Sequence, residues 1–310
     1  MKKIITFLLA LLMIFCVPGC TVKEKTGRVF GITSMDNSNP FFITIIDTIK
    51  QEVENRGDSL IIIDGAFNQQ KQIDGIESMI LQDIDGIFLN PVEYKGIEPA
   101  LDALNEAGIP IINYDTLVAS YDKVVTFVGS DNRNAGYICG EDLVKRLPKG
   151  GKIIIIKSES VDAVCSRVEG FNEAIKGHGI EIVGESDGNC EQELAMAEAT
   201  DLFQAFPDVD AVFAANDPMA KGVLAAAESA GMKDVIIYGV DGSPDLKAEI
   251  AKENSLVVGT GAQSPLTIAK KSVEVMYAYL NGEKIEKNYP VETFLINKDN
   301  ILEFGIEEWQ

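Results

Sequence analysis

The chain has 310 residues, of which 46% are apolar, and its formal net charge is −21 at pH 7. This amount of apolar sequence can form the cores of two domains of common size, which excludes a disordered chain. The acidic balance argues against nucleic acid and anionic lipid surfaces as partners, because both present phosphate groups.

The first twenty residues have the pattern of a secretory leader. Two lysines precede an uncharged apolar stretch at 4–17, and the segment closes on Val-Pro-Gly-Cys. The stretch is too short to span a bilayer as a helix. We interpret 1–20 as the signal peptide of a lipoprotein, Cys20 as its lipidated first mature residue, and 21–27 as a polar tether. Plain secretion and an uncleaved anchor are the alternatives.

Each of these interpretations places the rest of the chain outside the cytoplasm. A lipid on Cys20 would hold it at the outer face of the cell membrane, which is the periplasmic side in a Gram-negative cell. Loss of the two leader lysines takes the net charge from −21 to −23.

The segment 34–42, Ser-Met-Asp-Asn-Ser-Asn-Pro-Phe-Phe, lies between an apolar run and a stretch with helical periodicity. It is predicted as a strand-to-helix turn, with Asn39 as the N-cap and Pro40 at the first helical position, where its missing N–H costs nothing. Asn39 and Phe41 are therefore expected at the carboxyl end of a strand, where open α/β sheets bind small molecules.

Short β-branched runs alternate with amphipathic helical segments along the chain, a rhythm typical of parallel sheets. The predicted strands are 29–32, 60–63, 87–89, 109–112, 124–128, 152–156, 180–183, 211–214, 235–240 and 256–259. Besides the helix that begins at Pro40, the predicted helices are 69–81, 97–107, 134–147, 162–175, 193–206, 218–229 and 265–280.

Ten strands are too many for one compact sheet, and the rhythm restarts near Lys152 after a Pro-Lys-Gly-Gly turn at 148–151. The expected fold is therefore α/β, with two doubly wound parallel-sheet domains. No close internal repeat is evident in the sequence.

Acid or amide side chains follow six of the predicted strands: Asp64, Asn90, Asp115, Asn216, Asp241 and Gln263. The carboxyl ends of parallel strands lie along one edge, so the two halves are expected to present these groups to each other across a cleft. Carboxylates accept hydrogen bonds and amides both donate and accept, which suits a neutral ligand with several hydroxyl groups. The alternative for each residue is an N-cap of the next helix.

The cysteines show neither metal-type spacing nor a disulfide framework. After Cys20 only Cys139, Cys165 and Cys190 remain. A bridge between Cys165 and Cys190 and buried unpaired thiols are both open alternatives, because sequence alone does not establish that two thiols meet.

The residues also argue against an enzyme. His178 is the only histidine and lies in a Lys-Gly-His-Gly turn, so neither a Ser-His-Asp triad nor a multi-histidine metal site is expected. An exposed turn histidine is the preferred interpretation. A glycoside-acting enzyme that uses Asp115 and Asp241 as paired carboxylates is a rival hypothesis.

Several segments, in order along the chain, resemble the periplasmic sugar-binding proteins of ABC transporters, of the type closest to the ribose-binding protein. This fold is shared with the effector domains of LacI-type repressors. The resemblance covers roughly residues 28–296. It rests on Asn39-Pro40-Phe41-Phe42, Leu89-Asn90-Pro91, Tyr114-Asp115, Gly129-Ser130-Asp131-Asn132, Arg167-Val168-Glu169-Gly170-Phe171, Pro207-Asp208-Val209-Asp210-Ala211-Val212-Phe213, Asn216-Asp217, Gly239-Val240-Asp241-Gly242 and Tyr289-Pro290-Val291.

The resemblance implies a set of ligand-binding residues. Phe41 and Phe42 match aromatic positions that hold the faces of a sugar ring. The expected polar contacts are Asn39, Asn90, Asp115, Arg167, Asn216, Asp241 and Gln263. For Arg167, whose guanidinium would offer fixed donors, the alternative is a surface helix residue paired with Glu169 or Asp162.

Two positions depart from the ribose-type pattern. Thr116 stands where an arginine is usual, and Cys190 stands where a phenylalanine is usual. The first change removes a donor group and the second a stacking surface, so we expect a hexose, another pentose or a different polyol in place of ribose. Tyr114 or Tyr94 is a candidate for the missing contact.

The resemblance also implies an architecture and a role. The expected lobes are 28–130 with 264–291 and 131–263 with 292–310, joined by a three-stranded hinge near Ser130, Gln263 and Val291, with the ligand cleft between them. Hinge closure around a monosaccharide would present the receptor to an ABC-type permease and, indirectly, its ATPase. We expect a monomer without cofactor or metal.

Two further roles were weighed. A sugar or autoinducer receptor that feeds a signalling partner is the alternative function. A transcriptional repressor is disfavoured because residues 1–27 contain no helix-turn-helix and no basic stretch.

Overall fold

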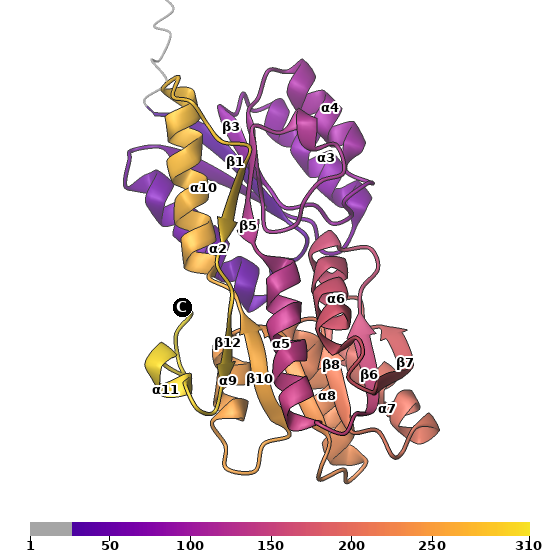
Figure 1. Cartoon of the computed structure of the whole chain (residues 1–310). Helices are drawn as coiled ribbons and strands as arrows, with labels where there is room; N and C mark the ends of the chain where they lie inside the picture. Colours follow the sequence, from indigo (N-terminus) through magenta and orange to yellow (C-terminus); the bar gives the residue numbers. More distant parts are fainter. Residues whose placement is uncertain (1–26) are drawn as a thin grey trace, which may run out of the picture.

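The alternation of β-branched runs and amphipathic segments produces two α/β domains, each built on a six-stranded sheet (Figure 1). A computed structural model describes residues 27–310. The predicted signal peptide, Cys20 and all of the predicted tether except its last residue lie outside the described residues. Within the described part, no helix has the length and apolar character needed to cross a bilayer.

The first sheet is parallel throughout and has the order β11-β5-β4-β3-β1-β2. Its central strands are short and completely buried, as expected for strands covered by helices on both faces. Its strands are β1 (Val29–Ser34), β2 (Ser59–Asp64), β3 (Gly86–Leu89), β4 (Ile111–Tyr114), β5 (Thr126–Ser130) and β11 (Asn288–Val291).

The second sheet has the order β12-β10-β9-β8-β6-β7, which repeats the order of the first. All of its pairs are parallel except β10 with β12, where Ala262 lies opposite Phe294. Its strands are β6 (Gly151–Lys157), β7 (Ile180–Asp187), β8 (Ala211–Ala214), β9 (Ile236–Asp241), β10 (Val257–Ala262) and β12 (Phe294–Asn297).

Helices cover both faces of each sheet. In the first domain, α2 (Pro40–Glu54) packs against α10 (Pro265–Leu280), and α3 (Gln69–Ile80) packs against α4 (Glu98–Glu106). In the second domain, α5 and α6 form one pair and α7 and α8 another. The bounds in the second domain are α5 (Asn132–Arg146), α6 (Asp162–Ile175), α7 (Gln192–Ala205), α8 (Asp217–Ser229) and α9 (Pro244–Ile250), followed by α11 (Ile301–Phe304).

All ten predicted strands and all eight predicted helices are present, with shifts of a few residues at their ends. The sequence patterns did not reveal the short helices α9 and α11 or the strands β11 and β12. Each of these two strands lies at one edge of its sheet. Strand β11 contains Pro290, which is tolerated only at a sheet edge because it lacks the N–H needed for a central strand.

The chain passes between the two sheets three times, at 130–132, 262–265 and 291–294. These positions include the predicted crossings near Ser130, Gln263 and Val291. The carboxyl ends of the parallel strands in both sheets therefore point toward the junction of the domains, and the last residues of the described chain lie beside that junction (Figure 1).

Two small sequence questions are answered by the structure. Cys139, Cys165 and Cys190 are all free thiols, so the bridge between Cys165 and Cys190 is not formed. His178 is exposed in the turn after α6, as predicted.

Helices α5 and α6 are in close backbone contact at glycines, and the tightest approach involves one glycine on each helix. A methyl group on Gly136 would lie 1.8 Å from the backbone oxygen of Arg167, and one on Gly170 would lie 1.9 Å from that of Arg133. Only glycine permits this backbone contact. The close approach fixes the depth at which Arg167 enters the junction.

We therefore predict that Gly136→Ala pushes α6 away from α5 and lowers the free energy of unfolding by about 1–3 kcal/mol, the usual cost of an overpacked contact. Urea unfolding measures the loss. Gly75→Ala, also within a helix, is the comparison, because the atoms nearest to its methyl group belong to the Ile63 side chain (2.4 Å) and not to backbone. Equal stability of the two variants would contradict the prediction.

Candidate functional site

The polar residues that follow the strands converge at the junction of the domains. Asp115 and Asp241 leave β4 and β9, one in each domain, and both have positive φ, 61° and 153°. Gln263 follows β10, and Asn216 lies just after β8. These side chains meet because the carboxyl ends of both parallel sheets face the same gap.

A small buried cavity of about 30 Å³ lies at this meeting point. Both domains contribute to its wall: α2 brings its first turn, and α6 brings Arg167. The wall consists of Met35, Asn39, Phe41, Phe42, Asp115, Thr116, Val161, Ala163, Val164, Arg167, Cys190, Asn216, Asp241 and Gln263. Of the nine residues predicted to bind ligand, only Asn90 is missing from it.

Asn90 lies behind the cavity instead of on its wall. Its carboxamide donates to Asp115 Oδ2 (3.2 Å) and its oxygen accepts from the backbone N–H of Met35 (3.0 Å). It is fully buried, so its geometry is that of a positioning residue that holds the Asp115 carboxylate. Asp64 also stays away from the cavity, because its Oδ1 accepts from the backbone of Asn37 and Ala66.

Two of the amides combine a capping role with a place on the wall. Asn39 Oδ1 accepts from the N–H of Phe41 (3.0 Å) at the start of α2, with Pro40 as the first helical residue, as predicted. Asn216 Oδ1 accepts from the N–H of Met219 (2.9 Å) at the start of α8. Capping and a place on the cavity wall, which are alternatives from the sequence alone, are therefore combined in these two residues.

Arg167 is buried and fixed at three points. Its Nε donates to Asn132 Oδ1 (2.8 Å), and its Nη1 donates to the backbone oxygen of Ala215 (2.8 Å) and to Asp241 Oδ1 (3.3 Å). It pairs with neither Glu169 nor Asp162. The surface ion pair with Glu169 is formed by Arg133 instead.

Three buried carboxylates surround this single guanidinium. Burial raises the pKa of Asp241 to about 7, although the nearby Arg167 charge acts in the opposite direction. Burial likewise raises the pKa of Asp115 and of Asp217. The pocket therefore has an excess of acceptors and disfavours an anionic ligand.

Two acceptor atoms at the cavity have no partner. Asp115 Oδ1 and Gln263 Oε1 are both buried and accept no hydrogen bond from the described residues. Asp115 comes from the first domain, and Gln263 follows a strand of the second. A buried acceptor without a donor is costly, so a molecule that donates hydrogen bonds from between them would be stabilised.

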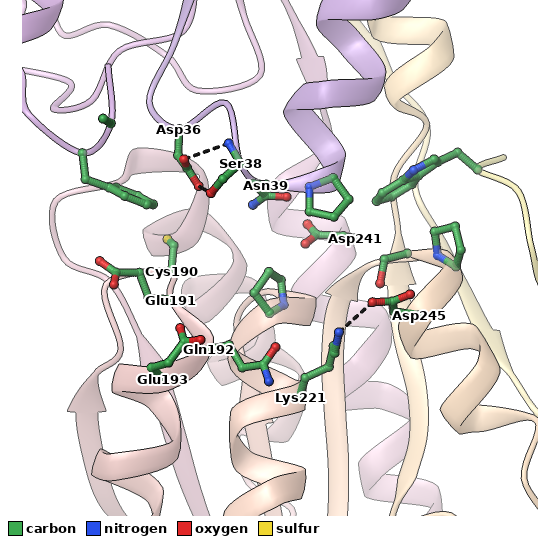
Figure 2. Close-up of a pocket in the computed structure, with 17 residues that line it drawn as sticks. Asp36, Ser38, Asn39, Cys190, Glu191, Gln192, Glu193, Lys221, Asp241 and Asp245 are labelled. Carbon is green, nitrogen blue, oxygen red and sulfur yellow. Dashed lines mark hydrogen bonds and ion pairs between the residues drawn. The ribbon is translucent and has the colours of Figure 1, made fainter. Parts of the chain in front are cut away.

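A larger groove of about 560 Å³ adjoins the cavity and shares Asn39, Cys190 and Asp241 with it. Figure 2 shows Asp36, Ser38 and Asn39 on one side of the groove and Glu191, Gln192, Glu193 and Lys221 on the other, with Asp241 between them. The groove extends the site from the buried cavity toward solvent.

Sequence reasoning missed the aromatic residues of this groove. Trp309 and Phe67 line it, and the Trp309 ring meets Phe41 edge-on with centroids 5.7 Å apart. Trp309 is the only tryptophan of the chain, and this was the one feature of the sequence that could have marked it as a candidate site residue. Neither Tyr114 nor Tyr94 reaches the cavity wall, and the Tyr114 hydroxyl donates to the backbone oxygen of Thr33 (3.2 Å).

The family described as periplasmic binding protein domain matches residues 30–284. The ribose import binding protein of Salmonella typhimurium is 31% identical over 299 residues, which cover 96% of this chain and 99% of that protein.

Solved structures agree with this match. An ABC transporter solute-binding protein from Mycobacterium smegmatis with bound glycerol has a TM-score of 0.85 at 30% identity, over 90% of this chain and 96% of that one. One from Bacillus halodurans with bound myo-inositol has a TM-score of 0.85 at 26% identity, over 92% and 100% of the two chains. The chain therefore belongs to the periplasmic binding protein family and is of the type that resembles the ribose-binding proteins.

Proposed function

We propose that this protein is an extracytoplasmic receptor that captures a monosaccharide, a pentose or a hexose, and delivers it to an ABC-type permease. The observation that carries the proposal is the pair of unpartnered buried acceptors, Asp115 Oδ1 and Gln263 Oε1. Sugar hydroxyls are neutral donors and would satisfy both atoms from one ring. The Salmonella relative is named for ribose, and the two solved structures hold bound glycerol and bound myo-inositol; all three molecules carry several hydroxyl groups.

The remaining wall suits the same class of ligand. The Arg167 guanidinium and the amide groups of Asn216 and Gln263 supply polar contacts in the plane of a ring, and Phe41 and Phe42 supply apolar surface for its C–H faces. Such contacts are strong in a site closed to water because nothing competes for them. These residues form the proposed binding set, with Asn90 in a positioning role.

The size of the cavity supports a hinge mechanism. A cavity of about 30 Å³ has room for roughly two water molecules, because each water needs roughly 10–15 Å³ of cavity volume. A sugar ring therefore enters only if the domains part first. The proposed lobes, 28–130 with 264–291 and 131–263 with 292–310, would turn about the three crossings and close again on the ligand.

No catalytic step is part of the proposal. Within residues 27–310 no group of three or more His, Cys, Asp or Glu side chains could hold a metal ion. The sugar is expected to leave the protein unchanged, and its recovery by chromatography after binding tests this against the glycoside-acting alternative.

Arg167→Ala is predicted to weaken binding of the recognised sugar by about 100-fold, because it removes a charged donor from a buried site. Titration calorimetry with a panel that includes D-ribose, D-allose, D-galactose and myo-inositol first identifies the ligand and then measures the loss. Arg133→Ala is the matched control, since this arginine lies in the adjoining helix and its ion pairs are exposed.

Circular dichroism of both variants checks that they are folded, and Arg167→Lys serves as a second variant that keeps the charge. Undiminished affinity in a folded Arg167→Ala protein would remove Arg167 from the site. Failure of the wild type to bind any sugar or polyol would overturn the proposed function.

The buried Asp241 predicts a specific pH effect on the unliganded protein. Its pKa is raised in the folded state to about 7, against 3.8 as the reference value, so the folded state holds this proton more tightly. The contribution of Asp241 to the free energy of unfolding is therefore most favourable below about pH 4, where the carboxyl is protonated in both the folded and the unfolded state. It is lost as the pH rises through about 7, because the buried carboxyl must then become charged.

The Tm of the wild type minus that of Asp241→Asn should accordingly fall between pH 5 and pH 8. Changes in packing that do not depend on pH cancel in this comparison. Differential scanning calorimetry at both pH values checks it, and a constant difference would contradict the assignment.

The proposed lipid anchor is tested in cells. We predict that Cys20→Ser abolishes incorporation of a radiolabelled fatty acid, because the acceptor of the lipid is lost. Cys16→Ser, also within the predicted signal peptide, is the control and should incorporate the label as the wild type does. Full labelling of Cys20→Ser would contradict lipidation at this residue.

A further inference from the structure

The groove beside the buried cavity is far larger than the space that the proposed sugar ring needs. It measures about 560 Å³ and communicates with the cavity through Asn39, Cys190 and Asp241. A ligand whose sugar ring is bound in the cavity can therefore extend into the groove while the ring keeps its hydrogen bonds with the cavity wall.

The two sides of the groove are formed by matching turns. Asp64-Gly65-Ala66-Phe67 follows β2, and Asp187-Gly188-Asn189-Cys190 follows β7, the equivalent strand of the second sheet. In each turn the aspartate accepts from the backbone N–H two residues later, at 2.9 and 2.7 Å, and the last two residues have positive φ. The two turns therefore share their backbone geometry, although only the aspartate and the glycine are identical in sequence.

The matching turns place different side chains at equivalent points. The first domain presents the half-buried ring of Phe67, whereas the second presents the small thiol of Cys190. Because the Cys190 side chain is small, the groove is wide on that side, whereas the Phe67 ring provides an aromatic surface on the other. A bulky residue at 190 would fill part of the space.

Trp309 supplies a second aromatic surface and connects the groove to the cavity. Its ring is half-buried, lines the groove and packs edge-on against Phe41, which lies on the cavity wall. The backbone of the same segment is anchored, because the buried Lys247 ammonium donates to the backbone oxygen of Glu308. Trp309 is thus held in place for contact with whatever occupies the groove.

The charges of the groove limit what can occupy it. Asp36, Glu191 and Glu193 contribute carboxylates, and the nearest cation, Lys221, is already paired with Asp245 at 2.6 Å. A phosphate or carboxylate group would be repelled. A neutral or cationic group with a flat apolar face would be attracted by both the charge and the aromatic rings.

We infer that the groove is a second subsite and that the ligand is a glycoside: its sugar ring occupies the buried cavity, and a neutral or cationic substituent lies in the groove that Phe67 and Trp309 line. This inference rests on the proposed sugar-binding function and specifies its substrate class.

Calorimetry with paired probes tests the inference. D-ribose, D-allose, D-galactose and D-glucose are each compared with their methyl and 4-nitrophenyl glycosides and with their terminal phosphates. We expect at least one 4-nitrophenyl glycoside to bind about tenfold more tightly than its free sugar, and no phosphate to bind more tightly than its free sugar.

Phe67→Ala and Trp309→Ala should each remove most of the glycoside advantage, and with Phe67→Ala the affinity for the free sugar should change less than about twofold. Leu81→Ala is the control, because this side chain is 86% exposed and lies outside the groove. The Phe67 variant remains informative if loss of Trp309 disturbs Phe41.

The outcomes distinguish failure of the second subsite from failure of the proposed sugar-binding function. If a free sugar binds and every glycoside binds equally or more weakly, the second subsite is excluded and the proposed function stands. If both aromatic variants retain the full glycoside advantage, the groove is not the site of the substituent. If a phosphate binds more tightly than its free sugar, the assigned charge preference is wrong. If no sugar, polyol or glycoside binds, both proposals fail.

Discussion

One buried cation, Arg167, is the constraint on which the junction of the two domains depends. It lies 3.3 Å from Asp241 in its own domain, and its charge also acts on Asp115 of the other domain, where it opposes the rise in pKa caused by burial. Isolated buried carboxylates would be too costly to keep charged, and a single guanidinium shared among them makes the cluster tolerable. The glycine contact between α5 and α6 sets where that guanidinium lies, so helix packing in one domain determines the electrostatics of the cleft.

The repeated order of the two sheets explains why so few residues create a site. Equivalent strands end at equivalent places, so Asp115 and Asp241, each with positive φ, meet across the gap. Residues held in this strained region are concentrated at functional sites. The surrounding hydrogen bonds, such as those that Asn90 and Asp217 provide to Asp115 and Asp241, keep the two carboxylates in these conformations.

Much of the fold was predictable because its signals are local. β-branched runs, the Asn39-Pro40 cap and amphipathic periodicity identified the elements, and the polar residues after the strands identified most of the cavity wall. Edge strands β11 and β12 escaped because they are short and half-exposed, and β11 includes Pro290. The sequence could not show that Asn90 lies behind the cavity while the other predicted residues lie on its wall. Whether an amide faces a cavity or supports a carboxylate depends on packing. Trp309 lies far along the chain from Phe41, and no local pattern joins them. The lobe bounds and the binding set remain predictions.

The order of the strands also has a consequence for synthesis of the protein. Strand β5 receives its edge partner β11 only when residues 288–291 have been made, and helix α10, which covers α2, comes from the same late part of the chain. Until then the first domain has an open sheet edge and an uncovered apolar helix face. A growing chain with this arrangement cannot complete its first domain before nearly all of the second has been translated, so N-terminal folding stays incomplete throughout elongation.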